Sequence, residues 1–141
     1  MMVPLALGIS AVLLLLAIVH LYWAAGGDGA AGAVPEVDGA PAFVPRTVDT
    51  LAVALALTLG ALVVLGRAGL WTPGWAAPLL FQGGVWLLCV VFLFRSIGDF
   101  RLVGFFKRIR GTRFARRDTL FYSPLCFVLG VALLRLALLD P

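Results

Sequence analysis

The chain has 141 residues, of which 62% are hydrophobic and 13% are charged, and its formal net charge at pH 7 is +4. Soluble domains carry about 25% charged residues, so this chain has too few charges to cover a surface exposed to water. The composition therefore excludes an ordinary soluble domain and predicts one integral membrane domain over residues 1–141.

Four apolar segments are long enough to cross a bilayer as helices, which requires about 20 apolar residues each. The first has no basic N-terminal region and is longer than the apolar core of a signal peptide, so we expect it to remain as a span. In the fourth, Ser123 and Pro124 predict the start of the regular helix, because serine is a good N-cap and proline is favoured at N1. The predicted fold class is all-α, a four-span transmembrane helix bundle, with spans at residues 3–25, 48–66, 78–97 and 120–139.

Two loops, 26–47 and 98–119, lie on the same side of such a bundle. The first loop contains Pro35, Pro41 and Pro45, which forbid a long helix and predict a coil against the membrane surface. In the other loop, residues 100–110 place apolar side chains on one side of a helical wheel and basic ones on the other, although Phe100 breaks the pattern. This pattern predicts a short amphipathic interfacial helix between spans three and four.

The charge distribution predicts the orientation. Residues 95–118 hold eight basic and two acidic residues, a net charge of +6. Because short basic loops stay in the cytoplasm, we expect both loops to be cytoplasmic and both termini to lie outside a bacterial plasma membrane. We expect the basic side chains to contact anionic inner-leaflet lipids and, being held at the membrane, not to bind nucleic acid. The predicted lipid contacts are Lys107, Arg108, Arg110, Arg113, Arg116 and Arg117.

Residues 26–49 carry the opposite charge. They hold four acidic residues and one arginine, a net charge of −3. We hypothesise that this segment docks onto the basic segment 95–118 and forms a lid over the cytoplasmic end of the bundle.

Polar residues gather where the four spans meet the cytoplasmic side. His20 is the single histidine and is a candidate acid or base; the alternative is a hydrogen-bonded residue at the interface. Asp99 and Asp118 are candidate catalytic acids, and the alternative for each is an ion pair that fixes helix ends, with Arg95 as one partner for Asp99. Further candidates for ligand binding are Tyr22, Trp23, Arg95, Arg101 and Tyr122.

No cofactor or metal site is expected. One histidine cannot form a metal site alone, and Cys89 and Cys126 lie in separate apolar runs, where buried thiols are the simplest interpretation.

Two strings carry a family resemblance: HLYWAAGG, residues 20–27, and IGDFRLVGFFKRIRGTRFARRDTLFYSPLC, residues 97–126. Together with the four spans, they resemble an uncharacterised bacterial membrane family, domain of unknown function 3995. The resemblance implies a multi-pass membrane protein and supplies no activity or catalytic residues.

Three functions stay open. The first is a protein that binds or acts on a lipid-like or isoprenoid-like molecule at the cytoplasmic membrane face. The second is a non-enzymatic accessory or structural subunit that binds a membrane protein partner or a second copy of itself. A small transporter fits less well, because no ionisable residue lies in the middle of a span. Motifs of soluble enzymes are missing, so whether the protein is an enzyme stays undecided.

Overall fold

Four long helices form the protein in a computed structural model that describes residues 1–139. The first three are α1 (Met2–Ala24), α2 (Thr47–Arg67) and α3 (Pro78–Ile97). The fourth runs without a break through α4 (Arg113–Arg117), a π-helical turn η2 (Asp118–Tyr122) and α5 (Ser123–Leu138). All four are long and apolar enough to cross a membrane, which confirms the predicted four-span pattern.

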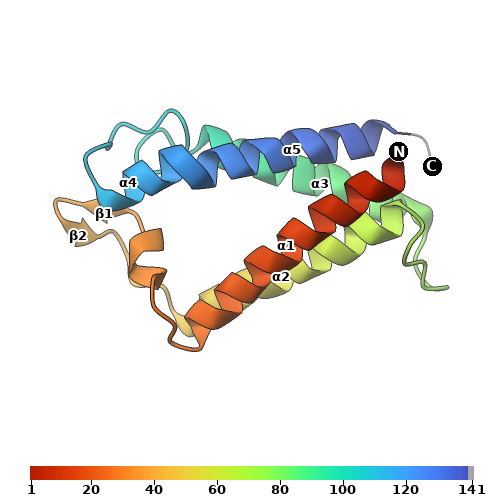
Figure 1. The fold of residues 1–141 in the computed structure, drawn as a ribbon, viewed down its shortest axis with the longest axis horizontal. Coiled ribbons are helices and arrows are strands. Elements are labelled where there is room, and N and C mark those ends of the chain that lie inside the picture. The colour runs from red at the N-terminus through yellow and green to blue at the C-terminus, as the bar shows by residue number, and fades with distance from the viewer. Residues whose placement is uncertain (140–141) are drawn as a thin grey trace.

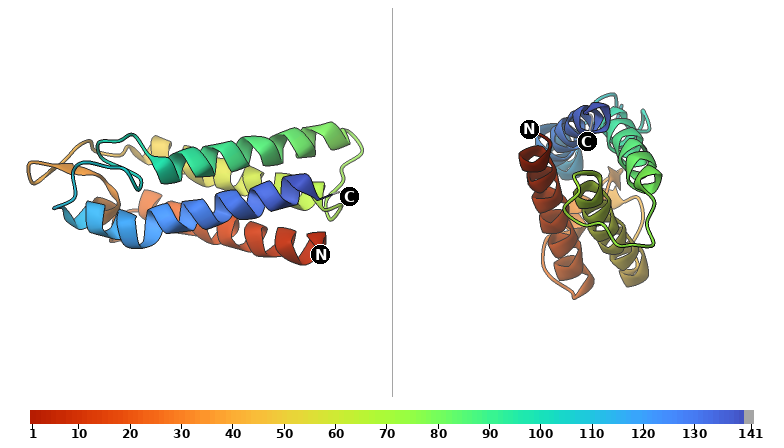
Figure 2. Two further views of the ribbon diagram at one scale, coloured as in Figure 1. Left: turned by 90° about the horizontal axis from the view of Figure 1, so that it is seen from above. Right: turned by 90° about the vertical axis from the view of Figure 1, so that its right-hand side faces the viewer.

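The helices pair as two hairpins. Helix α1 packs along α2, α3 packs along α5, and smaller interfaces join α2 to α3 and α1 to α5. Figure 1 shows that the two pairs lie close together near the chain termini and diverge towards the opposite end, and Figure 2 shows the same bundle from above and end-on. We call these the terminal end and the loop end. Large apolar side chains remain exposed along all four helices, as expected for surfaces that face lipid. The shared core consists of Ala6, Ile9, Leu13, Ala61, Val64, Val85, Cys89, Phe92, Leu129, Leu133, Leu136 and Ala137.

Glycines permit close helix packing at several of these interfaces. A Cβ atom added at Gly130 of α5 would lie 2.6 Å from Leu93 Cδ2 of α3, and one at Gly84 of α3 would lie 2.6 Å from Val63 Cγ1 of α2. These distances are too short for a real contact, so only glycine allows the present spacing. Small residues at helix interfaces are typical of membrane bundles, which gain stability from close packing.

The first loop has more structure than the coil predicted from its prolines. It contains a 3₁₀ turn η1 (Ala30–Ala33) and a short antiparallel hairpin of β1 (Glu36–Val37) and β2 (Ala40–Pro41). The hairpin turn is Asp38-Gly39, and both residues have positive φ, 51° and 80°. Such an Asp-Gly pair matches a type I′ hairpin turn. The all-α prediction therefore holds for the spans but missed this hairpin.

The predicted interfacial helix over residues 100–110 is wrong. Residues 98–112 form a series of bends and turns. Gly98, Phe100 and Gly104 have φ values of 89°, 61° and 88°, which an α-helix cannot contain. Gly98 and Gly104 also pass so close to each other that neither backbone leaves room for a Cβ atom.

The regular helix α5 begins at Ser123, as predicted, with Pro124 in its first turn. Ser123 is not an N-cap, however, because the continuous fourth helix begins ten residues earlier, after Thr112, whose hydroxyl accepts a 3.0 Å hydrogen bond from the Ala115 N–H. Ser123 has helical dihedral angles, φ −67° and ψ −44°. Pro124 lacks an N–H and cannot complete a regular α-turn, and the wider π-helical turn lies directly before Ser123 and Pro124.

A larger side chain at Gly130 should loosen the α3–α5 interface. We expect Gly130→Val to destabilise the bundle by about 1–3 kcal/mol, because the added atoms collide with Leu93. The matched control is Gly83→Val, since a Cβ at the exposed Gly83 meets nothing within 4 Å. Thermal unfolding in detergent gives the Tm of each variant. Equal Tm values for the two variants would contradict the packing argument.

Candidate functional site

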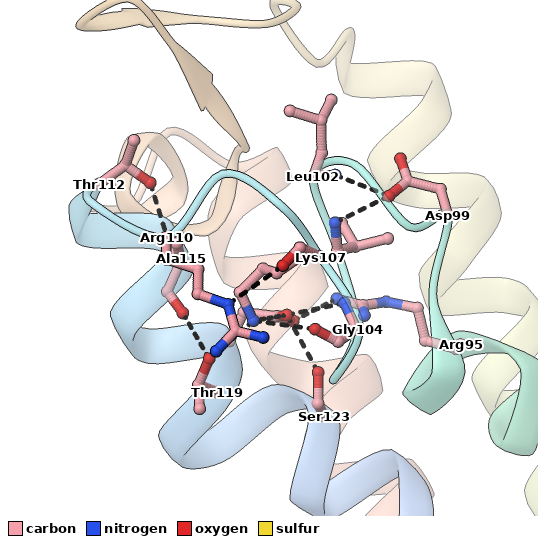
Figure 3. A network of polar contacts seen from close by, with 12 residues as sticks. Arg95, Asp99, Leu102, Gly104, Lys107, Arg110, Thr112, Ala115, Thr119 and Ser123 are labelled. Carbon is pink, nitrogen blue, oxygen red and sulfur yellow. Dashed lines mark hydrogen bonds and ion pairs between the residues drawn. The ribbon is translucent and has the colours of Figure 1, made fainter.

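A buried carboxylate, Asp118, lies at the loop end, and its side chain has no solvent exposure. It accepts hydrogen bonds from Arg95 Nη2, the Gly104 N–H and Lys107 Nζ, each at 2.9 Å, and from Ser123 Oγ at 3.0 Å. Figure 3 shows these donors converging from α3, from residues 98–112 and from the fourth helix. Because a buried charge is costly unless it is paired and hydrogen-bonded, this set of donors is what allows Asp118 to be buried.

Lys107 is the second buried ion of this cluster, with 2% of its surface exposed. Its Nζ donates to Asp118 Oδ2 at 2.9 Å, to the Gly104 carbonyl at 2.9 Å and to Thr119 Oγ1 at 2.7 Å. All three protons of the ammonium group are used. The structure therefore corrects the prediction that Lys107 contacts lipid headgroups, since its ammonium group points into the protein.

The geometry of this cluster favours a structural role. Oδ2 of Asp118 accepts three of these hydrogen bonds and Oδ1 accepts the fourth, and the carboxylate is fully buried, so it is held between two cations rather than presented to a substrate. This arrangement corresponds to the ion-pair alternative that we weighed for Asp118. Within the described part of the chain, Arg95 Nη1 is a buried nitrogen without a hydrogen-bond partner, so the second cation of the cluster is less completely bonded than Lys107.

Asp99 organises the loop that follows α3. Its Oδ1 accepts the backbone N–H groups of Arg101, Leu102 and Val103 at 2.9, 2.7 and 3.0 Å. Desolvation of the carboxyl group opposes ionisation, but these backbone donors outweigh it and hold the pKa of Asp99 below its usual range. The expected Arg95 partner is not used, because Arg95 pairs with Asp118.

An open pocket of about 470 Å³ lies elsewhere at the loop end, between α1, α2 and the first loop. Its walls are mainly apolar, and the lining residues that carry polar side-chain atoms are His20, Trp23, Thr47, Asp49 and Thr50. The carboxylate, Asp49, is already bound by Arg46 through two hydrogen bonds of 3.0 and 3.1 Å. The lining residues are His20, Trp23, Ala24, Ala30, Ala33, Val34, Pro41, Phe43, Val44, Pro45, Thr47, Asp49, Thr50 and Val53.

His20 is held in a defined orientation at this pocket. Its Nδ1 lies 2.7 Å from the carbonyl oxygen of Leu16, one turn earlier in α1, and its ring packs edge-on against Trp23 with centroids 5.2 Å apart. A carbonyl oxygen has no proton, so Nδ1 must be the donor in this contact. The ring nitrogen left for a ligand is therefore Nε2.

The remaining candidates for ligand binding do not join either site. The Tyr22 hydroxyl accepts a 3.2 Å hydrogen bond from the Asp28 N–H, and Tyr122 packs against Phe114 with ring centroids 6.1 Å apart. Arg101 is exposed. The structure thus splits the predicted single cluster in two: Arg95 lies with Asp118, and His20 lies with Trp23.

The other predicted lipid-contact residues are exposed, unlike Lys107, and so are placed where headgroups can reach them. One of them, Arg110, also donates a 3.2 Å hydrogen bond to the Lys107 carbonyl, a contact within the same loop. The exposed set is Arg108, Arg110, Arg113, Arg116 and Arg117.

The first loop does meet the basic segment, but not through the charge pairs that we hypothesised. Elements η1 and β1 contact α4, and Gly32 of η1 lies against the Arg117 guanidinium so closely that a Cβ would collide with it. Within residues 1–139, the three ion pairs are Arg46–Asp49, Arg95–Asp118 and Lys107–Asp118, and none of them joins the two segments.

No group of three or more histidine, cysteine or acidic residues is placed to hold a metal ion within residues 1–139. Cys89 is buried and donates to the Gly130 carbonyl at 3.4 Å, so it forms part of the α3–α5 interface.

Sequence reasoning missed several residues of the Asp118 cluster. Lys107 was grouped with the arginines, although it is the single lysine of the chain, and only the structure shows that its ammonium group is buried. Gly104 and Thr119 were not singled out, and no pattern in the sequence marks them. They belong to the site because Gly104 supplies a backbone N–H and Thr119 supplies a hydroxyl oxygen.

Removing the charge of Asp118 should release residues 98–112. We expect Asp118→Asn to leave buried Lys107 without its counter-ion, at a cost of about 3–5 kcal/mol, so that trypsin cleaves this arginine-rich loop much faster. Asp38→Asn at the exposed hairpin turn is the control. Replacing the pair together, as Asp118→Leu with Lys107→Met, should recover part of the resistance, because the fully buried lysine charge is then absent. The recovery stays partial because Arg95, whose side chain is 34% exposed, still loses its counter-ion. Unchanged cleavage in Asp118→Asn would contradict a supporting role for the cluster.

Comparisons with known proteins bear on the whole chain. The family model described as "Protein of unknown function (DUF3995)" matches residues 13–133. No curated protein and no solved structure gives a significant match. The family match covers all three functional elements above, the Asp118 cluster, the Asp99 loop and the His20 pocket. It confirms the resemblance drawn from the sequence strings, and the chain therefore belongs to the DUF3995 family of proteins of unknown function.

Proposed function

We propose that this multi-pass membrane protein binds an amphipathic, lipid-like or isoprenoid-like molecule in the His20 pocket. The observation that carries the proposal is the pocket itself: a largely apolar hollow with a few polar groups where two spans meet a structured loop. Ligand sites usually combine apolar walls with a small number of placed polar groups. A molecule with an apolar tail suits such walls, because burying the tail removes apolar surface from water.

The position of the pocket supports a ligand that comes from the bilayer. Val53 lies about two turns into α2, and His20 lies one turn before the end of α1. The pocket therefore extends from the loop end into the apolar part of these helices. A tail reaches this part from the lipid phase, while the head stays near His20, Thr47 and Thr50.

The same proposal places the loop end at the cytoplasmic side of a bacterial plasma membrane. Residues 95–118 carry the net charge of +6, and the exposed arginines among them suit anionic headgroups. The Asp118 cluster supports this surface, since it folds residues 98–112 and holds their arginines outside.

Cysteine labelling tests the orientation. In a Cys89→Ala, Cys126→Ala background, Gly74→Cys should react with an impermeant maleimide in intact cells, because residue 74 lies in the loop at the terminal end. Arg108→Cys should react only after permeabilisation. Both positions are exposed, so reversed labelling would overturn the orientation.

Filling the pocket tests the binding. Val53 lines the pocket with 44% of its surface exposed, so Val53→Trp adds bulk there with little disturbance of the core. The matched control is Leu55→Trp on the same helix, which is 60% exposed and does not line the pocket. Native mass spectrometry of gently extracted protein should show a discrete bound molecule in the wild type and in Leu55→Trp, reduced at least about tenfold in Val53→Trp, because a tryptophan occupies the ligand volume.

If all three proteins carry the same broad mixture of bulk lipids, the binding proposal is wrong. The accessory-subunit alternative would then become the better hypothesis.

A further inference from the structure

We infer that the ligand of the His20 pocket has an uncharged head bearing a hydroxyl group, so that the site takes a lipid alcohol and rejects the corresponding lipid phosphate. This inference rests on the proposed function and adds the chemical class of the head group. It follows from two independent features of the pocket, its charge and the tautomer of its histidine.

The charge of the lining disfavours a phosphate head. No lysine or arginine lines the pocket, and its single charged lining residue is Asp49. Arg46 lies next to the pocket, but its guanidinium is engaged by both oxygens of Asp49. An anion moved from water into this pocket would therefore lose part of its hydration, and the neighbouring cation, Arg46, would have to be shared with Asp49, so an anionic head gains less there than a neutral one.

Apart from Arg46, the cationic residues of the loop end belong to the other helical hairpin and its connecting loop. Two cations of that hairpin, Lys107 and Arg95, are committed to Asp118. Arg117 approaches the first loop at Gly32, but neither residue lines the pocket. Although residues 95–118 are strongly basic, their charge is thus not presented to a head group in the His20 pocket.

The tautomer of His20 favours a donor on the ligand. Since Nδ1 carries the proton that is donated to the Leu16 carbonyl, Nε2 of the neutral ring carries a lone pair and accepts. A hydroxyl group can donate to this nitrogen, whereas an ether oxygen cannot. Thr47 and Thr50 line the same pocket. The Thr50 hydroxyl donates to the Arg46 carbonyl at 3.3 Å, so its oxygen can still accept a hydrogen bond from a hydroxyl head.

Three probes with the same tail test the inference: oleyl alcohol, oleyl methyl ether and oleyl phosphate. Each is titrated into purified full-length protein, and the bound fraction is measured by native mass spectrometry. We expect the alcohol to bind at least about tenfold more tightly than the phosphate, because of the incompletely compensated burial of an anion. We expect it to bind about two- to tenfold more tightly than the ether, the range of one hydrogen bond.

Two variants separate the contributions. His20→Phe keeps a ring of similar size but removes the Nε2 acceptor. The ratio of the affinities for the alcohol and the ether should therefore fall to about one. Asp49→Asn frees the Arg46 guanidinium to pair with an anion. The ratio of the affinities for the alcohol and the phosphate should therefore decrease, whereas the ratio for the alcohol and the ether should not change.

The outcomes distinguish this inference from the proposed function. If Val53→Trp weakens the binding of all three probes but the wild-type protein binds the phosphate as tightly as the alcohol, the inference of an uncharged head is wrong and the pocket remains a lipid site. If alcohol and ether bind equally in the wild type, the hydrogen bond to His20 is wrong. If Val53→Trp and Leu55→Trp bind every probe as the wild type does, the proposed function itself fails.

Discussion

A carboxylate inside a membrane protein must be surrounded by donors, and the donors around Asp118 come from parts of the chain that would otherwise be independent. Arg95 comes from α3, Gly104 and Lys107 come from residues 98–112, and Ser123 comes from the fourth helix. Leaving one buried ion of such a set unpaired costs several kcal/mol. The position of Asp118 therefore dictates both how α3 meets the fourth helix and how the chain between them folds.

The path of residues 98–112 follows from that constraint. To deliver the Gly104 N–H and the Lys107 ammonium to Asp118, the chain turns back on itself at Gly98 and Gly104, where the two backbones meet without room for a side chain. Asp99 stabilises the turn by binding three consecutive N–H groups. The neighbouring arginines are exposed, so the loop is basic outside, while inside it the Gly104 N–H and the Lys107 ammonium bind Asp118.

The loop end thus contains two chemically different regions. The region beside α3 and α5 is an ion cluster in which Asp118 is fully buried and paired with Arg95 and Lys107. The region beside α1 and α2 is an open, mainly apolar pocket with an oriented histidine. Because the Asp118 carboxylate is buried and paired whereas the oriented His20 ring lines an open pocket, we assign support to the first region and ligand binding to the second.

The sequence by itself determined the four spans, the position of the polar residues at one end and the family, because span length and apolar composition are local properties. The tertiary structure decided the rest. Phe100, which broke the helical pattern, has positive φ, and periodicity could not show that Lys107 would turn inward. Nor could it divide the polar end into a cluster and a pocket. Which buried groups meet depends on how the two hairpins pack, and that packing is set by contacts between residues far apart in the chain.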